Sequence, residues 1–212
     1  MHIAEGILSG PVLLGGGLAA AAGTAIGLRA IRDDDIPRVA MLTTVFFVAS
    51  LIHVPIGPGS VHLILSGLCG LLLGMRAFPA ILVALFLQAV LFGFGGLMVL
   101  GANTTILAGP AALLGAAARA WMNRSPAVAR WAPLVAGGTA ALSIASSGAL
   151  AALALALSDR SFVGAAALLF AAHAPIIAVE AVITAGIAGF LMKVRPELLI
   201  EGGLLHGPAR RD

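Results

Sequence analysis

The sequence predicts an all-α membrane protein, a polytopic bundle of about seven transmembrane helices whose N-terminus lies outside and is tucked into the bundle. Composition is the first reason: 60% of the 212 residues are hydrophobic, 10% are charged and the mean hydropathy is +1.09. Soluble domains carry about 25% charged residues, so the bilayer is the expected solvent. Segment length is the second reason, because apolar runs of about 15 to 25 residues suit membrane helices and exceed the strands of a β-barrel.

The expected spans are the apolar stretches that lie between charged or Pro- and Gly-rich connections, namely residues 12–31, 39–53, 61–75, 80–100, 104–120, 133–157 and 162–192. The glycines at 93–96 predict a kink or a close helix crossing in the fourth stretch. Pro175 predicts a break in the last one, because proline removes a backbone donor from a helix.

The connections predict how the spans are joined. Residues 54–60 are too rich in Pro and Gly for a helix, so we expect a loop there, with Ser60 capping the next helix. A turn is expected at 101–103. Residues 1–192 should then form a single transmembrane domain, followed by a cytoplasmic tail at 193–212.

Basic residues indicate which side of the membrane each connection faces. Of the 12 Lys and Arg residues, Arg160 alone lies in the second, fourth or sixth connection, so the other 11 lie in the odd-numbered connections and the tail. Such residues stay in the cytoplasm, which places the N-terminus outside together with His2, His53 and His62. The basic pI of about 10.4 thus reflects topology and gives no reason to expect nucleic-acid binding.

The first two residues form a candidate metal chelator. The α-amine of Met1, the backbone nitrogen of His2 and its imidazole can close fused chelate rings around one transition-metal ion. His62 is the expected fourth nitrogen, because it follows a glycine-containing loop on the same outer side. Four nitrogens in a plane suit nickel or copper, and cobalt also accepts such ligands. The alternative is that His2 is simply an exposed second residue.

Four further polar residues are candidates for supporting roles. His53 is a further ligand, a partner that orients His62, or an interface histidine. Asn103, beside the expected outer turn, is a candidate to support the ligands by hydrogen bonding. His173 and Glu180 share one face of a helix, and ionisable groups at this depth normally face the bundle interior. A structural hydrogen bond is the expected role of each, with a release path or a subunit contact as the alternative.

Three motifs carry a family resemblance: Met1-His2-Ile3-Ala4-Glu5-Gly6-Ile7-Leu8-Ser9, the Pro55-Ile56-Gly57-Pro58-Gly59-Ser60-Val61-His62 loop, and His173-Ala174-Pro175 followed by Glu180. With them the chain resembles the CbiM/NikM family, the substrate-capture (S) components of energy-coupling factor transporters for cobalt and nickel. The resemblance runs from Met1 to about Met192. It implies metal ligands at Met1, His2 and His62. His53 stands where many relatives have no histidine, so its role stays open.

The implied function is that of the substrate-binding membrane subunit of an ATP-driven importer of divalent transition metal in the bacterial cytoplasmic (inner) membrane. The loop at 55–62 looks more like the cobalt branch, so Co²⁺ for cobalamin synthesis is the expected transported substrate. Nickel uptake by the same mechanism is the alternative, which a planar set of nitrogens favours. No catalytic residue and no cofactor of the chain's own is expected.

The resemblance also implies partners. These are a membrane coupling (T) subunit, ATP-binding subunits and a small two-helix accessory membrane protein. ATP hydrolysis falls to the partners, because the sequence has no Gly-rich loop that ends in Gly-Lys-Ser/Thr. A membrane-embedded metal-dependent enzyme that uses His173 and Glu180 is the alternative of another class, but the His-Glu-x-x-His spacing of such enzymes is absent from the sequence.

Overall fold

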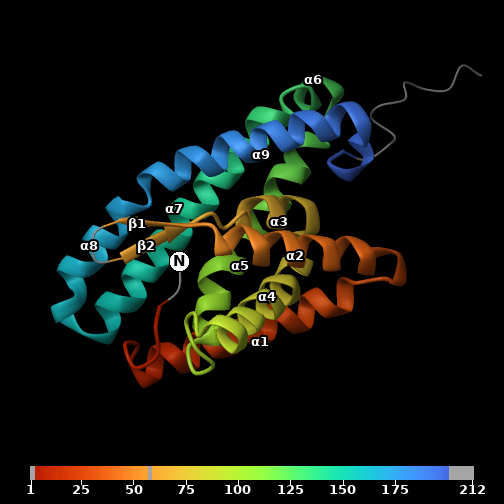
Figure 1. Cartoon of the computed structure of the whole chain (residues 1–212). Coiled ribbons are helices and arrows are strands. Elements are labelled where there is room, and N and C mark those ends of the chain that lie inside the picture. The colour runs from red at the N-terminus through yellow and green to blue at the C-terminus, as the bar shows by residue number, and fades with distance from the viewer. Residues whose placement is uncertain (1–2, 57–58, 201–212) are drawn as a thin grey trace, which may run out of the picture.

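The computed structural model describes residues 3–56 and 59–200, and these form a bundle of helices with one β-hairpin (Figure 1). The longer helices are α1 (Gly10–Ala30), α2 (Ile36–Leu51), α4 (Ala77–Phe92), α5 (Leu100–Met122), α7 (Ala132–Ser158) and α9 (Ala174–Val194). The shorter helices are α3 (Ser66–Leu73), α6 (Pro126–Ala129) and α8 (Val163–Ala172), with 3-10 turns η1 (Asp33–Asp35), η2 (Gly74–Arg76), η3 (Arg160–Phe162) and η4 (Pro196–Leu198). The antiparallel hairpin consists of β1 (His53–Ile56) and β2 (Gly59–His62).

The helices confirm an all-α, multi-pass membrane protein. Among the described residues, five helical stretches are long and apolar enough to cross a membrane: Gly10–Ala30, Ser66–Phe92, Leu100–Met122, Ala132–Ser158 and Phe170–Val194. The expected third and fourth spans fall together in the second of these, where η2 divides α3 from α4. The expected second span is α2, which has 16 residues.

Two sequence expectations about the connections are wrong. The segment after α2 is a β-hairpin, and α3 begins at Ser66, so residues 61–65 do not open the next helix and Ser60 is no helix cap. The turn expected at 101–103 lies inside α5. The chain instead reverses after Phe92, because Gly93, Gly95 and Gly96 adopt positive φ angles that only glycine accepts readily.

The break expected near Pro175 is present and divides α8 from α9 at His173. The two ranges expected for α1 and α7 agree with the observed helices to within about two residues, which is the usual uncertainty of helix ends. Beyond α9, Leu199 and Ile200 are buried, and the Leu198 carbonyl accepts a hydrogen bond of 3.1 Å from Arg38. The chain therefore stays packed against the bundle as far as residue 200.

Helix α5 lies at the centre and packs against α1, α3, α4 and α7. Its crossing with α3 is close, because both helices present glycine there: a Cβ on Gly70 would lie 1.9 Å from the Ala111 carbonyl oxygen, and one on Gly115 would lie 2.2 Å from the Gly70 carbonyl carbon. Small residues allow such an approach between membrane helices. The crossing ties α3, which follows the hairpin directly, to the middle of the bundle.

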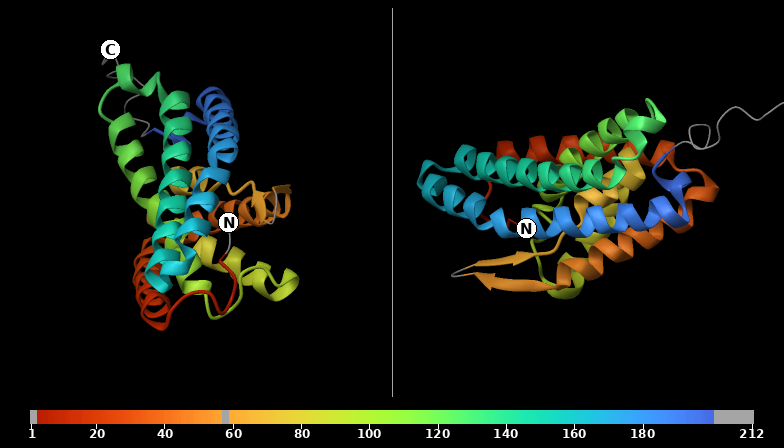
Figure 2. Two further views of the ribbon diagram at one scale, coloured as in Figure 1. Left: turned by 90° about the vertical axis from the view of Figure 1, so that its left-hand side faces the viewer. Right: turned by 90° about the horizontal axis from the view of Figure 1, so that it is seen from above.

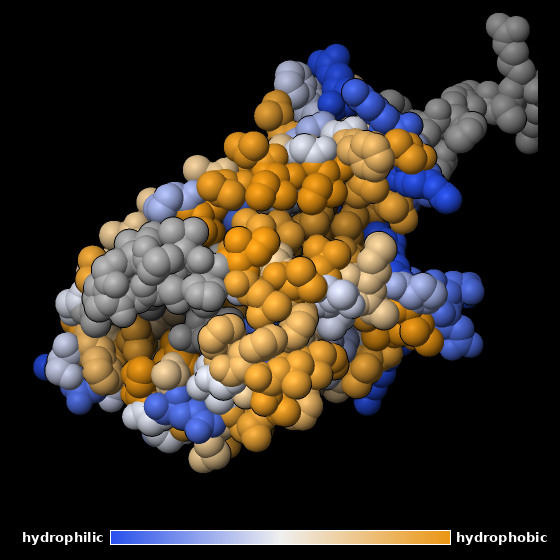
Figure 3. All heavy atoms as spheres, viewed as in Figure 1, coloured by the Kyte–Doolittle hydropathy of each residue, from blue (hydrophilic) through white to orange (hydrophobic). Residues whose placement is uncertain are grey.

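The bundle has two distinct ends. The hairpin points to the end at which α7 turns into α8, here named the hairpin end (Figure 2). The opposite end holds the turn between α1 and α2 and helix α6. There Arg76 bonds the Ala30 carbonyl at 2.8 Å and pairs with Asp35 at 3.0 Å. On the face shown in Figure 3, hydrophobic side chains cover the middle of the molecule, and hydrophilic ones gather mostly at the opposite end.

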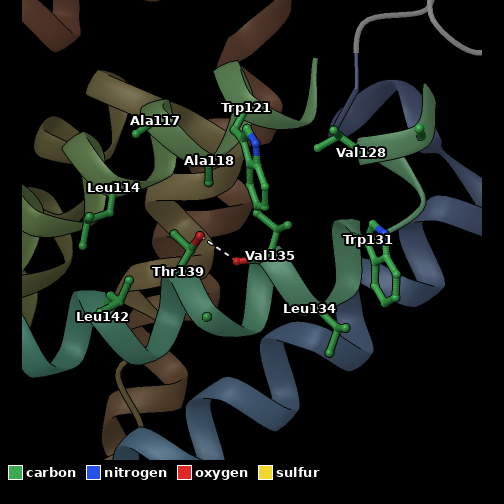
Figure 4. Close-up of a pocket in the computed structure, with 12 residues that line it drawn as sticks. Leu114, Ala117, Ala118, Trp121, Val128, Trp131, Leu134, Val135, Thr139 and Leu142 are labelled. Carbon is green, nitrogen blue, oxygen red and sulfur yellow. Dashed lines mark hydrogen bonds between the residues drawn. The ribbon is translucent and has the colours of Figure 1, made fainter. Parts of the chain in front are cut away.

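A shallow apolar groove lies between α5, α6 and α7 at the opposite end (Figure 4). Trp121 and Trp131 both line it and are exposed. The guanidinium of Arg130 lies 5.5 Å from the ring centroid of Trp131. Indole rings next to a basic residue are typical of the boundary between lipid tails and headgroups.

Candidate metal site

The N-terminal segment is docked into the hairpin end through the amide of Asn103. The Asn103 Oδ1 accepts the Ile3 backbone N–H at 3.1 Å, and its Nδ2 donates to the Ile3 carbonyl at 3.1 Å. Both residues are buried, at 5% and 4% exposed. Asn103 lies in the first turn of α5 and not in a loop, so a rigid helix holds this backbone in place.

Glu5 anchors the same segment to the glycine loop that follows α4. Its backbone N–H donates to the Gly95 carbonyl at 3.2 Å, and its carboxylate accepts the Met98 N–H at 2.9 Å. The loop leaves room for this side chain because residue 96 is glycine: a Cβ there would lie 2.1 Å from Cγ of Glu5. The glycines that were predicted to kink a helix therefore form part of the loop to which the N-terminal segment is hydrogen-bonded.

The segment is also fixed where it enters α1. Leu8 is buried in the core, and the Ser9 N–H donates to Oγ of Ser158 at the end of α7, 3.0 Å away. In the turn after α7, the carboxylate of Asp159 accepts the Ser161 N–H at 2.7 Å, which lowers the pKa of Asp159 from its ordinary value. The hydrogen bond therefore keeps the Asp159 carboxylate ionised to a lower pH than that of an ordinary aspartate.

The hairpin carries the two predicted histidines of the second connection. His53 pairs with His62 across the strands, so the backbone brings these two residues directly opposite each other. A further bond of 3.3 Å, from the Leu63 N–H to the Ile52 carbonyl, continues the pairing beyond the strands. The side chains of residues 53–62, like Met1 and His2 as a whole, lie outside what the structure describes.

Glu180 lies closer to the hairpin than its sequence position suggests. Although 116 and 115 positions of sequence separate it from Ile64 and Leu65, its Oε1 accepts the N–H groups of both, at 2.7 Å for Leu65. The contact arises because residues 63–65 run into the bundle before α3 begins. Sequence reasoning missed this partner; the only available signal was that a carboxylate in a membrane helix needs one.

The other candidates are dispersed among the described residues. His173 is buried where α8 meets α9. Within 3–56 and 59–200, excluding the hairpin side chains, no group of three or more His, Cys, Asp and Glu side chains is arranged to hold a metal ion. Cys69 is buried in α3.

Helices long enough to span a membrane, together with an N-terminal segment bonded to α5 from residue 3 onward and a hairpin that carries two histidines, define a multi-pass membrane protein. The sequence from residue 2 to 198 matches the family model of CbiM, the cobalt uptake substrate-specific transmembrane region. The chain belongs to this family, and is a cobalt or nickel transport component of the CbiM/NikM type.

Two curated relatives agree with this assignment. A metal transport protein of Haemophilus influenzae is 40% identical over 201 residues, which are 94% of this chain and 97% of the relative. The fused nickel transport protein NikMN of Rhodobacter capsulatus is 32% identical over 200 residues, or 86% of this chain and 58% of that longer protein.

Solved structures share the fold as well. The crystal structure of a transition metal transporter aligns with a TM-score of 0.79 at 27% identity, over 92% of this chain and 93% of the other. A truncated transition metal transporter aligns with a TM-score of 0.77 at 25% identity, over 91% of this chain and 99% of the other.

Proposed function

We propose that this chain is the substrate-binding membrane subunit of an ATP-driven energy-coupling factor importer, and that it captures Co²⁺ for cobalamin synthesis, or Ni²⁺ by the same mechanism. The observation that carries the proposal is the pair of hydrogen bonds between Asn103 and the Ile3 backbone. An N-terminus held by its main chain, one residue from His2, is suited to binding through its own nitrogens.

The proposed ligands are the amine of Met1, the backbone and imidazole nitrogens of His2, and His62. Asn103 supports this set by fixing the residue that follows His2, and groups in such a supporting position typically change metal affinity by about 10- to 100-fold. His53 is proposed as a supporting partner or a further ligand, because it lies opposite His62 in the hairpin. The transported ion is the substrate, and no cofactor is assigned to the chain.

One argument favours nickel as the transported ion, and another favours cobalt. A planar set of nitrogens that includes a backbone amide favours nickel. The likeness of the 55–62 loop to the cobalt branch, together with the cobalt uptake family to which the chain belongs, favours cobalt. We give the second argument more weight, because nitrogen donors alone accept either ion.

The proposed assembly contains a membrane coupling subunit, ATP-binding subunits and a small two-helix accessory membrane protein, in the bacterial inner membrane. Residues 1–192 are the proposed substrate-binding domain, and 193–212 the cytoplasmic tail. A fused relative such as NikMN supports the idea that a second component works beside this one. ATP hydrolysis is assigned to the partners.

Insertion of two alanines between Met1 and His2 tests the chelate. Two residues are needed, because with one the amine, two amides and the imidazole can still wrap around an ion. We expect binding of Co²⁺ and Ni²⁺ by the purified chain to weaken at least about 100-fold, since the fused rings are lost. Isothermal titration measures the affinity, and metal analysis after exposure to equal concentrations of both ions measures the preference.

The controls separate the chelate from a general loss of structure. His62→Ala should weaken binding to a similar extent, whereas His173→Ala and the exposed Ala4→Ser should leave it near that of the unmodified chain. Unchanged binding after the insertion would reject the proposed ligand set, and loss in His173→Ala alone would move the site into the last helix.

A further inference from the structure

The carboxylate of Glu180 is buried in α9 and directed at the base of the hairpin. Its side chain is 0% exposed, and Oε1 accepts the N–H groups of two consecutive residues, Ile64 and Leu65. The Ile64 bond spans 116 positions of sequence. A buried carboxylate inside a membrane bundle is costly and is retained when it has a specific role.

The segment that Glu180 holds is buried in the core and has an unusual backbone conformation. Leu65 has φ 55° and ψ 23°, and it is the one described residue other than glycine with a positive φ. It precedes α3, and no side chain of its own segment caps that helix. Leucine is strained in this conformation, so a tertiary contact has to maintain it. Glu180 supplies that contact and satisfies two backbone donors in a setting without water.

The held segment follows His62 immediately. Ile64 lies two residues beyond His62, and the only residue between them, Leu63, pairs with Ile52 across the hairpin base. The return strand is thus anchored at Leu63 to the end of α2, and at Ile64 and Leu65 to α9. A shift of the second anchor would move the backbone of His62 with it, because only Leu63 separates His62 from Ile64 in the sequence.

We propose that Glu180 is a positioning residue for metal capture: by accepting the Ile64 and Leu65 N–H groups it sets the place of His62 relative to the docked N-terminus. This inference rests on the proposed ligand role of His62. It assigns to α9 a part in the site, although no α9 side chain is among the proposed ligands. This role requires a hydrogen-bond acceptor at the right distance and does not require a charge. We therefore expect the amide oxygen of a glutamine at residue 180 to perform it as well as the carboxylate.

Three substitutions at residue 180 and one matched control test the proposal on the purified full-length chain. Glu180→Gln keeps an acceptor of the same length, Glu180→Met keeps the length without the acceptor, and Glu180→Asp keeps the charge but shortens the reach. Thr184→Val is the control, because Thr184 is equally buried one turn further along the same helix and its hydroxyl bonds no described residue. The readouts are the affinity for Co²⁺ and for Ni²⁺ by titration, the visible absorption spectrum of the Co²⁺-saturated protein, and the thermal midpoint without metal.

We expect Glu180→Met to bind about 10- to 100-fold more weakly with an altered Co²⁺ spectrum, Glu180→Asp to lose about tenfold, and Glu180→Gln to stay within about threefold of the unmodified chain. Thr184→Val should bind normally. If Glu180→Met does not fold, the Asp and Gln variants still decide the matter, because a positioning role predicts that Glu180→Asp alters the Co²⁺ spectrum and Glu180→Gln does not, whereas a structural role predicts a lower thermal midpoint with an unchanged spectrum.

Other results would overturn the proposal. Normal affinity and spectrum in Glu180→Met, or equal losses in the Gln and Asp variants, would reduce Glu180 to a structural role. A lowered thermal midpoint with an unchanged spectrum would do the same. Absence of metal binding by the unmodified chain, or normal binding by His62→Ala, would instead reject the proposed function.

Discussion

Asn103 illustrates how a single residue places the N-terminus. Its amide both donates and accepts, and it therefore satisfies the N–H and the C=O of Ile3 together. A buried backbone group left without a partner costs about 1–3 kcal/mol. With Asn103→Leu both groups lose their partner, and we expect the docked segment to detach and metal affinity to fall about 10- to 100-fold. Titration with Co²⁺ measures the loss.

Two further variants separate the hydrogen bonds from burial. Asn103→Asp can accept from Ile3 but cannot donate as a carboxylate, so its affinity should lie between those of Asn103→Leu and the unmodified chain. Thr104→Val is the matched control, since Thr104 is buried beside Asn103 and its hydroxyl donates to the Leu100 carbonyl of its own helix. An equal loss in the Thr104 variant would contradict a specific role for Asn103.

At the scale of the elements, the close crossing of α3 and α5 fixes the helix that follows the hairpin in the bundle. Both helices approach through glycine, and a Cβ on Gly70 would overlap the backbone of Ala111 at 1.9 Å. Because backbone atoms cannot rotate away, we expect Gly70→Ala to separate the helices and cost about 1–3 kcal/mol of stability or more. Thermal unfolding of the purified protein in detergent provides the measurement.

Gly109→Ala is the comparison for that experiment. Gly109 lies in α5, the helix that α3 crosses, but a Cβ there meets nothing within 4 Å, so alanine should be neutral or slightly stabilising through its helix propensity. Similar thermal midpoints for the two variants would show that the close crossing does not limit stability.

For the whole molecule, the distribution of Arg and Lys predicts which end faces outward. Asp34 lies in the turn between α1 and α2 at the opposite end, and Ser161 in η3 at the hairpin end; both are exposed. In a Cys69→Ala background, a membrane-impermeant thiol reagent applied to intact cells should label Ser161→Cys and spare Asp34→Cys. The reason is that 11 of the 12 basic residues, all except Arg160, belong to connections expected in the cytoplasm.

Lysed cells provide the control, because both cysteines should then react. Labelling of Asp34→Cys alone in intact cells would show that the topology is the inverse of the expected one, with the N-terminal segment in the cytoplasm. Metal capture from outside would then be excluded, although the hydrogen bonds that dock the segment would be unaffected.

Much of the fold was predictable, because apolar length and helix breakers are local properties. The extents of α1 and α7 and the break before Pro175 follow from runs of apolar residues bounded by proline, glycine and charge. The start of α3 was not predictable from Val61-His62-Leu63-Ile64-Leu65, because a short apolar run suits a helix or an extended strand equally. Packing against Glu180 decides between them.

The sequence by itself determined the membrane character of the chain, the extents of α1 and α7 and the presence of a candidate nitrogen chelator in its first two residues. These follow from composition and from neighbouring residues. Only the tertiary structure decided that Asn103 bonds a residue 100 positions away and that Glu180 holds the segment after His62. Such contacts depend on how the helices pack in three dimensions, which no local pattern in the sequence specifies.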